Sequence, residues 1–179
     1  MTMELLEYSS RDKLLKNKIK AISHEAKPED CYTCLKCTNG CPASKIFEDF
    51  APHKFQMAAY LGFAEDIINS GVLWYCFDCL TCQTRCPMLT SPAQTITSLT
   101  NIAVDRGISP PKAFVDMIKM ITKEGAIIKP RDVLTTDFDF VNRAGLGLPS
   151  RGIRNLEQFQ EALEIVGAFD PLKLTKSEK

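Results

Sequence analysis

Eight cysteines carry the chemistry that this sequence can perform, and they fall into two runs of four. Each run reads Cys-x2-Cys-x2-Cys-x3-Cys-Pro. The cysteines are Cys31, Cys34, Cys37 and Cys41 in the first run, and Cys76, Cys79, Cys82 and Cys86 in the second. Every cysteine of the second run lies 45 residues after its counterpart, so the runs form an internal repeat. In a reducing compartment, such cysteines indicate bound metal rather than a disulfide framework.

The spacing suits [4Fe–4S] clusters. Three cysteines at positions i, i+3 and i+6 of a tight loop can ligate three irons of one cube, and the fourth iron needs a thiolate from another direction. In two-cluster bacterial ferredoxins, the fourth cysteine of each such run ligates the other cluster. We therefore assign the ligands of one cluster as Cys31, Cys34, Cys37 and Cys86, and those of the other as Cys76, Cys79, Cys82 and Cys41.

Structural zinc is the main alternative, because two Cys-x2-Cys pairs can form a four-cysteine zinc site. Zinc does not require a third and a fourth cysteine at identical offsets in both runs. The doubled run therefore favours two [4Fe–4S] clusters.

Charged and aromatic side chains lie inside and beside the runs. Lys36 and Arg85 stand within them. A cation near a cluster favours the reduced state and raises its potential, although both could instead be solvated surface charges. We expect the neighbouring aromatic side chains to pack against the loops and exclude water. These side chains are Tyr32, Trp74, Tyr75 and Phe77. His53 follows Pro52 and is expected to be an ordinary surface or helix-end residue.

Length and charge limit the class of protein. A chain of 179 residues fits one domain, or a small domain with extensions. The 22 basic and 22 acidic side chains give no net charge. That balance argues against nucleic-acid binding and indicates a subunit of a complex. No apolar run approaches the ~20 residues of a membrane span, and the first 20 residues do not resemble a secretion signal. We expect a soluble, cytoplasmic protein.

The rest of the sequence predicts helices and no convincing strand. Apolar spacing and Pro or Gly boundaries place them at about 4–23, 52–61, 64–69, 93–106 and 155–166, with a further helix that starts at Ser109-Pro110-Pro111 and ends at about residue 124. The predicted fold is mostly α: an α-helical two-cluster ferredoxin domain over 29–125. Helical extensions are expected over 1–28 and 126–179, the second containing a loop and a final helix.

Residues 29–125 resemble the C subunit of heterodisulfide reductase. Small bacterial ferredoxins place their runs closer together, whereas 34 residues separate Cys41 from Cys76 here. The resemblance also rests on features between and after the runs. These are Leu61-Gly62, Ser70-Gly71, Trp74-Tyr75, Ala103 and Gly107.

The resemblance implies an electron-transfer subunit with two [4Fe–4S] clusters. It would relay single electrons from a flavin-containing A subunit to an adjacent-cysteine catalytic B subunit. The complex would reduce the coenzyme M–coenzyme B heterodisulfide of methanogenesis, or a related sulfur compound. The sequence contains no Cys-Cys pair and no Gly-x-Gly-x-x-Gly motif, so we expect no substrate binding and no activity alone.

The alternative function is that of a ferredoxin-like subunit of a flavin dehydrogenase. Such an enzyme would act on glycerol 3-phosphate, glycolate or succinate. Those chains generally carry further cysteine regions, which are absent here.

Overall fold

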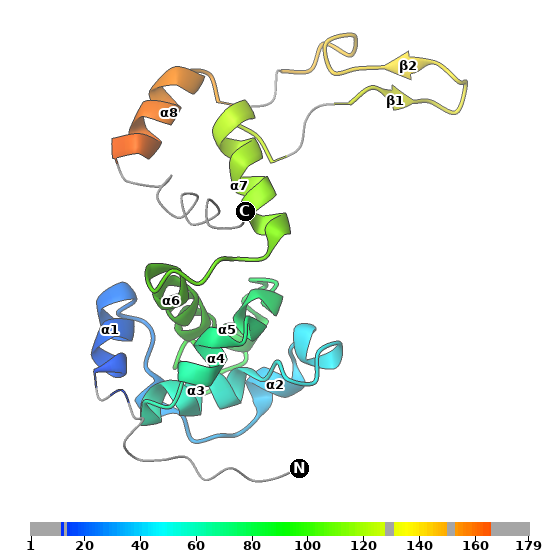
Figure 1. Cartoon of the computed structure of the whole chain (residues 1–179). Helices are drawn as coiled ribbons and strands as arrows, with labels where there is room; N and C mark the ends of the chain where they lie inside the picture. Colours follow the sequence, from blue (N-terminus) through cyan, green and yellow to red (C-terminus); the bar gives the residue numbers. More distant parts are fainter. Residues whose placement is uncertain (1–11, 13, 128–130, 150–152, 166–179) are drawn as a thin grey trace. The chain divides into compact units, whose positions relative to one another are not determined.

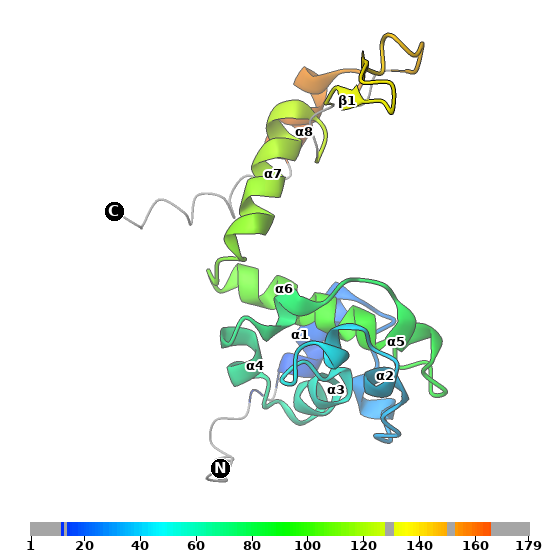
Figure 2. The same ribbon diagram turned by 90° about the vertical axis from the view of Figure 1, so that its right-hand side faces the viewer.

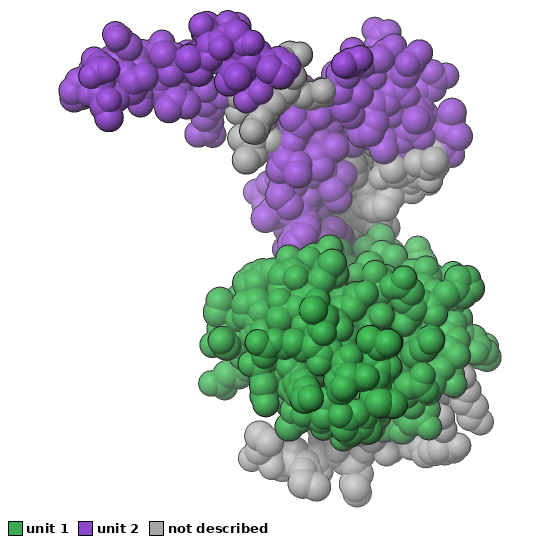
Figure 3. Space-filling view, turned by 180° about the vertical axis from the view of Figure 1, so that it is seen from behind, with its two compact units in different colours: residues 1–108 green, residues 109–179 purple. Residues whose placement is uncertain are grey.

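A computed structural model describes residues 12, 14–127, 131–149 and 153–165. The chain divides into two compact units, residues 1–108 and 109–179, which Figure 3 colours separately. The division into 1–28, 29–125 and 126–179 stays a prediction. Within the described ranges, no helix combines the length and apolar character needed to cross a membrane.

The first unit is built of helices, which confirms the mostly-α prediction (Figure 1). Its α-helices are α1 (Leu15–Ile22), α2 (Lys36–Asn39), α3 (Pro52–Leu61), α4 (Glu65–Asn69), α5 (Thr81–Thr84) and α6 (Pro92–Asp105). Short 3₁₀ helices lie at η2 (Pro28–Asp30), η3 (Ala43–Lys45) and η4 (Val72–Tyr75). The helix expected over 4–23 is observed over Leu15–Ile22, and residues 4–11 and 13 lie outside the described residues.

Proline and glycine set the ends of α3 as the sequence predicts. Pro52 occupies the first turn of α3, where a missing amide proton costs no intrahelical hydrogen bond. Gly62 ends the helix with φ of 81°, a left-handed conformation that glycine adopts without a steric penalty. Pro92 begins α6 in the same way. The two proline-started helices α3 and α6 pack against each other, as Figure 2 shows from the side.

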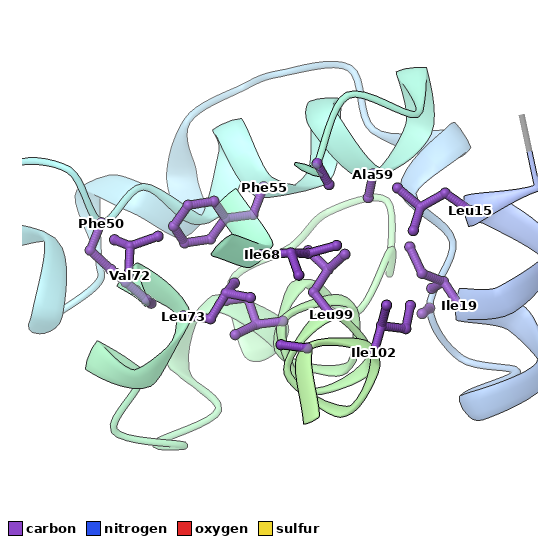
Figure 4. Close-up of a cluster of buried hydrophobic side chains, with 14 of the residues drawn as sticks. Leu15, Ile19, Phe50, Phe55, Ala59, Ile68, Val72, Leu73, Leu99 and Ile102 are labelled. Atoms are coloured by element: carbon purple, nitrogen blue, oxygen red, sulfur yellow. The ribbon is translucent and has the colours of Figure 1, made fainter. Parts of the chain in front are cut away.

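The core of this unit lies between α1, α3, α4, η4 and α6 (Figure 4). Leu15 and Ile19 project from α1, and Leu99 and Ile102 from α6. Phe50 and Phe55 meet edge to face, with their ring centroids 5.1 Å apart. Burying this apolar surface fixes α3 and α6, and the short helices α2 and α5 of the two cysteine runs contact α3 and α6.

The second unit contains α7 (Lys112–Glu124), α8 (Leu156–Ile165) and a small hairpin. Its strands are β1 (Val133–Leu134) and β2 (Phe140–Val141), paired antiparallel. The expectation of no strand is therefore wrong here, because strands of two residues are too short to show an alternating pattern.

The predicted start of the last helix is confirmed. The side chain of Asn155 accepts a hydrogen bond from the backbone N–H of Gln158 at 3.1 Å. Gln160 Nε2 donates to the carbonyl of Thr122 at 2.8 Å, which ties α8 to α7. The expected end at residue 166 lies outside the described residues.

Candidate metal centre

The fourth cysteine of each run lies with the first three cysteines of the other run. We call the two cavities concerned cavity A and cavity B. Cavity A is lined by Cys31, Cys34, Cys37 and Cys86. Cavity B is lined by Cys76, Cys79, Cys82 and Cys41. The short helices α2 and α5, which carry Cys37 and Cys82, contact each other. The groups match the crossed ligation predicted above, and the ligation itself stays a prediction.

The backbone bends in the same strained way in both runs. Thr33 and Asp78 have φ of 59° and 49°, and Leu35 and Leu80 have φ of 64° and 58°. Each pair occupies one position of the repeat. A non-glycine residue in this left-handed conformation raises the free energy of the folded state by about 1–3 kcal/mol, and such residues cluster at functional sites. The bends flank the second cysteine of each run, and the first of them brings Thr33 N–H within 3.5 Å of Cys31 Sγ.

The second cysteine of each run has a pKa below that of an ordinary thiol. A backbone hydrogen bond from Lys36 lowers the pKa of Cys34, and the hydroxyl of Thr81 lowers the pKa of Cys79. Thr81 Oγ1 lies 3.4 Å from Cys79 Sγ. Hydrogen bonds to sulfur favour the thiolate, which is the form that binds iron.

The third cysteine of each run behaves in the opposite way. Burial raises the pKa of Cys37, and burial together with the charges of neighbouring thiolates raises the pKa of Cys82 to about 12. Burial also raises the pKa of Cys76. Several thiolates can share such a site when a bound cation compensates their charge.

Both cavities fit a [4Fe–4S] cluster in donor chemistry. Each supplies four soft sulfur donors, the set that such clusters use. Among the residues that the structure describes, no three His, Cys, Asp or Glu side chains lie close enough together to hold one metal ion.

The remaining linings of the cavities differ. Cavity A includes His53, Gln56 and Thr90, whereas the matching helix positions in cavity B are Ala93 and Ile96. His53 Nδ1 lies 2.8 Å from Thr38 Oγ1 and is partly buried, so it is more than an ordinary helix end. Sequence reasoning missed Gln56 and Thr90 entirely. The signal that could have found Gln56 is that His53 and Gln56 follow Pro52 at the offsets at which Ala93 and Ile96 follow Pro92.

The aromatic side chains near the runs are more exposed than expected. Tyr32 is 56% exposed and Phe77 54% exposed. Tyr75 stacks on Phe47 with ring centroids 4.2 Å apart. Tyr32 therefore forms surface at the first loop, whereas Phe77 lines cavity B and leaves about half of its side chain exposed.

Comparison with known proteins identifies the family. Residues 23–87 match the model of a 4Fe-4S dicluster domain. The chain is 30% identical over 156 residues to the C subunit of the H(2):CoB-CoM heterodisulfide,ferredoxin reductase of Methanothermobacter thermautotrophicus, covering 87% of this chain and 79% of the relative. The chain belongs to the family of heterodisulfide reductase C subunits. This confirms the resemblance found in the sequence.

Two further relatives carry related names. The C subunit of the ferredoxin:CoB-CoM heterodisulfide reductase of Methanosarcina acetivorans is 28% identical over 163 residues, which are 82% of this chain and 65% of the relative. The iron-sulfur C 2 subunit of the CoB--CoM heterodisulfide reductase of Methanocaldococcus jannaschii is 35% identical over 77 residues, 43% of this chain and 40% of the relative. The matches thus span less than two thirds of these two relatives.

Family membership decides between the metals considered above. This member of the C-subunit family carries two [4Fe–4S] clusters and not structural zinc. It is an iron–sulfur electron-transfer protein.

Proposed function

We propose that the chain relays single electrons inside a heterodisulfide-reductase-type complex. Electrons would come from a flavin-containing A subunit and pass to an adjacent-cysteine catalytic B subunit. The complex would reduce the coenzyme M–coenzyme B heterodisulfide or a related sulfur compound. The observation that carries this proposal is the pair of cysteine cavities joined through the contacting helices α2 and α5.

The proposed ligands follow the grouping of the cysteines. Cys31, Cys34, Cys37 and Cys86 would hold the cluster of cavity A, and Cys76, Cys79, Cys82 and Cys41 that of cavity B. A bound [4Fe–4S] cluster supplies one-electron redox chemistry. The protein holds the two groups in neighbouring cavities and supplies the hydrogen bonds and the burial that adjust their potentials.

Exposed apolar side chains beside each cavity support two docking faces. Tyr32 and Leu35 lie exposed in the loop of cavity A, and Phe77 and Leu80 lie exposed in the loop of cavity B. Partners that bury these side chains would come close to one cluster each. One face would then receive electrons and the other would release them.

Disulfide reduction should not occur on this chain alone. All eight cysteines are assigned as proposed ligands, and the sequence contains no adjacent-cysteine motif. The alternative role is that of a ferredoxin-like subunit in a flavin dehydrogenase. In that role the chain would also relay electrons, but its partner proteins would differ.

Anaerobic reconstitution tests the proposed function. The purified chain with an artificial donor should reduce no disulfide, and adding the adjacent-cysteine partner should restore the reduction. Substantial turnover by the chain alone would overturn the relay. Failure to bind either partner would favour the flavin dehydrogenase.

Surface variants test the two docking faces in the same assay. Tyr32→Ala and Phe77→Ala should each weaken transfer with a different partner. Phe138→Ala, which removes an exposed ring from the second unit, is the matched control and should change neither transfer.

A further inference from the structure

The two cavities occupy equivalent places in the repeat but differ in polarity. Helices α3 and α6 both begin with proline after a cysteine run. The first and fourth residues after Pro52 are His53 and Gln56, which line cavity A. The corresponding residues after Pro92 are Ala93 and Ile96, which line cavity B. Equivalent helix positions thus present polar groups to one cavity and apolar groups to the other.

A buried hydrogen-bond chain ends on a sulfur of cavity A. Gln56 and Thr90 are 0% and 1% exposed. Gln56 Nε2 lies 2.8 Å from Thr90 Oγ1 and 3.3 Å from the Thr90 carbonyl oxygen. A carbonyl can only accept, so the amide nitrogen of Gln56 must face Thr90 and donate to it. The hydroxyl oxygen of Thr90 is thereby occupied as an acceptor.

The proton of the Thr90 hydroxyl is then free to point at Cys86. Thr90 Oγ1 lies 3.2 Å from Cys86 Sγ, and the backbone N–H of Thr90 donates to the same sulfur at 3.4 Å. A thiolate only accepts, so both bonds run from Thr90 to Cys86. Donation by Gln56 polarises the hydroxyl and strengthens its bond to the sulfur.

The corresponding position of the first run lacks this arrangement. Lys45 follows Cys41 at the offset at which Thr90 follows Cys86. Its side chain is exposed, so solvent screens its charge. The lining of cavity B is otherwise mainly apolar, and it includes the carboxylate-bearing Asp78 where cavity A has Thr33.

Reduction adds one negative charge to a cluster and its thiolates. Donors to sulfur stabilise that added charge, whereas an apolar lining and a nearby carboxylate oppose it. These three differences between the cavities act in the same direction. The hydroxyl of Thr81 beside Cys79 in cavity B does not set the cavities apart. The equivalent residue beside Cys34 in cavity A is Lys36, which offers a backbone hydrogen bond and a positive charge.

We propose that Gln56 and Thr90 make the cluster of cavity A the higher-potential member of the pair, the one on which the first electron rests. They are positioning residues that act through the sulfur of Cys86. The proposal rests on the electron relay proposed above and adds to it an order of the two sites. An electron delivered at cavity B would move downhill to cavity A.

An anaerobic redox titration of the purified holoprotein, followed by electron paramagnetic resonance, tests this order without partner proteins. Two separate one-electron steps are expected. Thr90→Val, which removes the hydroxyl and nearly keeps the shape, should lower the higher potential and leave the lower one in place. Thr90→Ser should restore the wild-type value.

Two further variants complete the test. Gln56→Leu should shift the higher potential in the same direction by less. Asp78→Asn should raise only the lower potential. This test is independent of the hydrogen bonds between Gln56, Thr90 and Cys86. Thr100→Val is the matched control, because the Thr100 hydroxyl donates to the carbonyl of Ile96 in its own helix.

Coincident potentials in the wild-type protein would overturn the proposal. So would a Thr90→Val variant that keeps both clusters and shifts neither potential, or shifts the lower one. If Thr90→Val loses a cluster, two other results test the proposal. The wild-type protein must show two separate potentials, and Asp78→Asn must raise only the lower one. Each of these failures leaves the electron relay intact, since the relay is judged by partner binding and turnover.

Discussion

Arg85 packs across the backbone of Gly40, the residue that holds the same place in the other run. Both precede the fourth cysteine of their run. A Cβ atom at Gly40 would lie 2.7 Å from Arg85 Cδ and 2.8 Å from Arg85 Nη1. The two runs therefore meet closely at this point, and the repeat cannot carry a long side chain at both positions.

Gly40→Ala is expected to destabilise the holoprotein by about 1 kcal/mol, because Arg85 must move away from the new methyl group. Thermal unfolding under anaerobic conditions measures the effect. Arg85→Ala in the same chain should recover most of the loss. Gly145→Ala is the control, since its nearest atom outside the flanking residues, Asn142 Oδ1, lies at 3.4 Å. Equal losses at Gly40 and Gly145 would contradict the prediction.

Crossed ligation predicts which cluster each cysteine variant damages. Cys41→Ser should damage the cluster of cavity B, as Cys79→Ser does. Cys86→Ser should damage the cluster of cavity A, as Cys34→Ser does. Iron content and electron paramagnetic resonance of the four variants check this. If Cys41→Ser and Cys34→Ser affect the same cluster, each run ligates locally and the assignment is wrong.

Anaerobic removal of iron should leave the region from Cys31 to Cys86 largely unfolded. Cluster binding contributes folding free energy, and without it the strained residues at Thr33, Leu35, Asp78 and Leu80 lose their compensation. Near-ultraviolet circular dichroism of the apoprotein is the measurement. A native-like spectrum without iron would contradict the prediction, because the helical core alone would then keep this region folded.

A carboxylate beside the first run should make stability depend on pH. Glu29 Oε1 lies 2.5 Å from Lys20 Nζ and 3.4 Å from Lys16 Nζ, so it links α1 to the segment before Cys31. Burial opposes ionisation of Glu29, but it is outweighed by the hydrogen bond from Lys20 together with the smaller effects of a backbone hydrogen bond and the charges of Lys16 and Lys20. They hold the pKa of the carboxyl below its ordinary value of 4.5.

Because the folded pKa is lowered, the stabilisation exists above pH 4.5 and is lost as the pH falls through the folded pKa. Glu29→Gln should therefore cost up to ~1 kcal/mol at pH 7, since partly exposed pairs contribute little more. The difference from the wild type should shrink toward zero in acid. Anaerobic unfolding at several pH values checks this, with the exposed Glu161→Gln as control. A difference that persists unchanged in acid would exclude the ionised carboxylate as its cause.

Local sequence determined the cofactor type and most of the helices. Ligand identity and spacing are one-dimensional properties, so the doubled cysteine run indicated two [4Fe–4S] clusters before any packing was known. Helix boundaries at Pro52, Gly62 and Pro92 followed from backbone chemistry that acts within a few residues. The hairpin of β1 and β2 escaped prediction because two residues are too few for a pattern.

Only the tertiary structure decided how the two cavities differ. Gln56 and Thr90 are 34 residues apart and meet because α3 packs on α6. Thr38 and His53 are 15 residues apart and meet across α2 and α3. No local propensity encodes such pairs, since each arises when apolar burial brings two helices together. The repeat therefore made the clusters look equivalent in the sequence, and the packing of α3 and α6 gave each one a different environment.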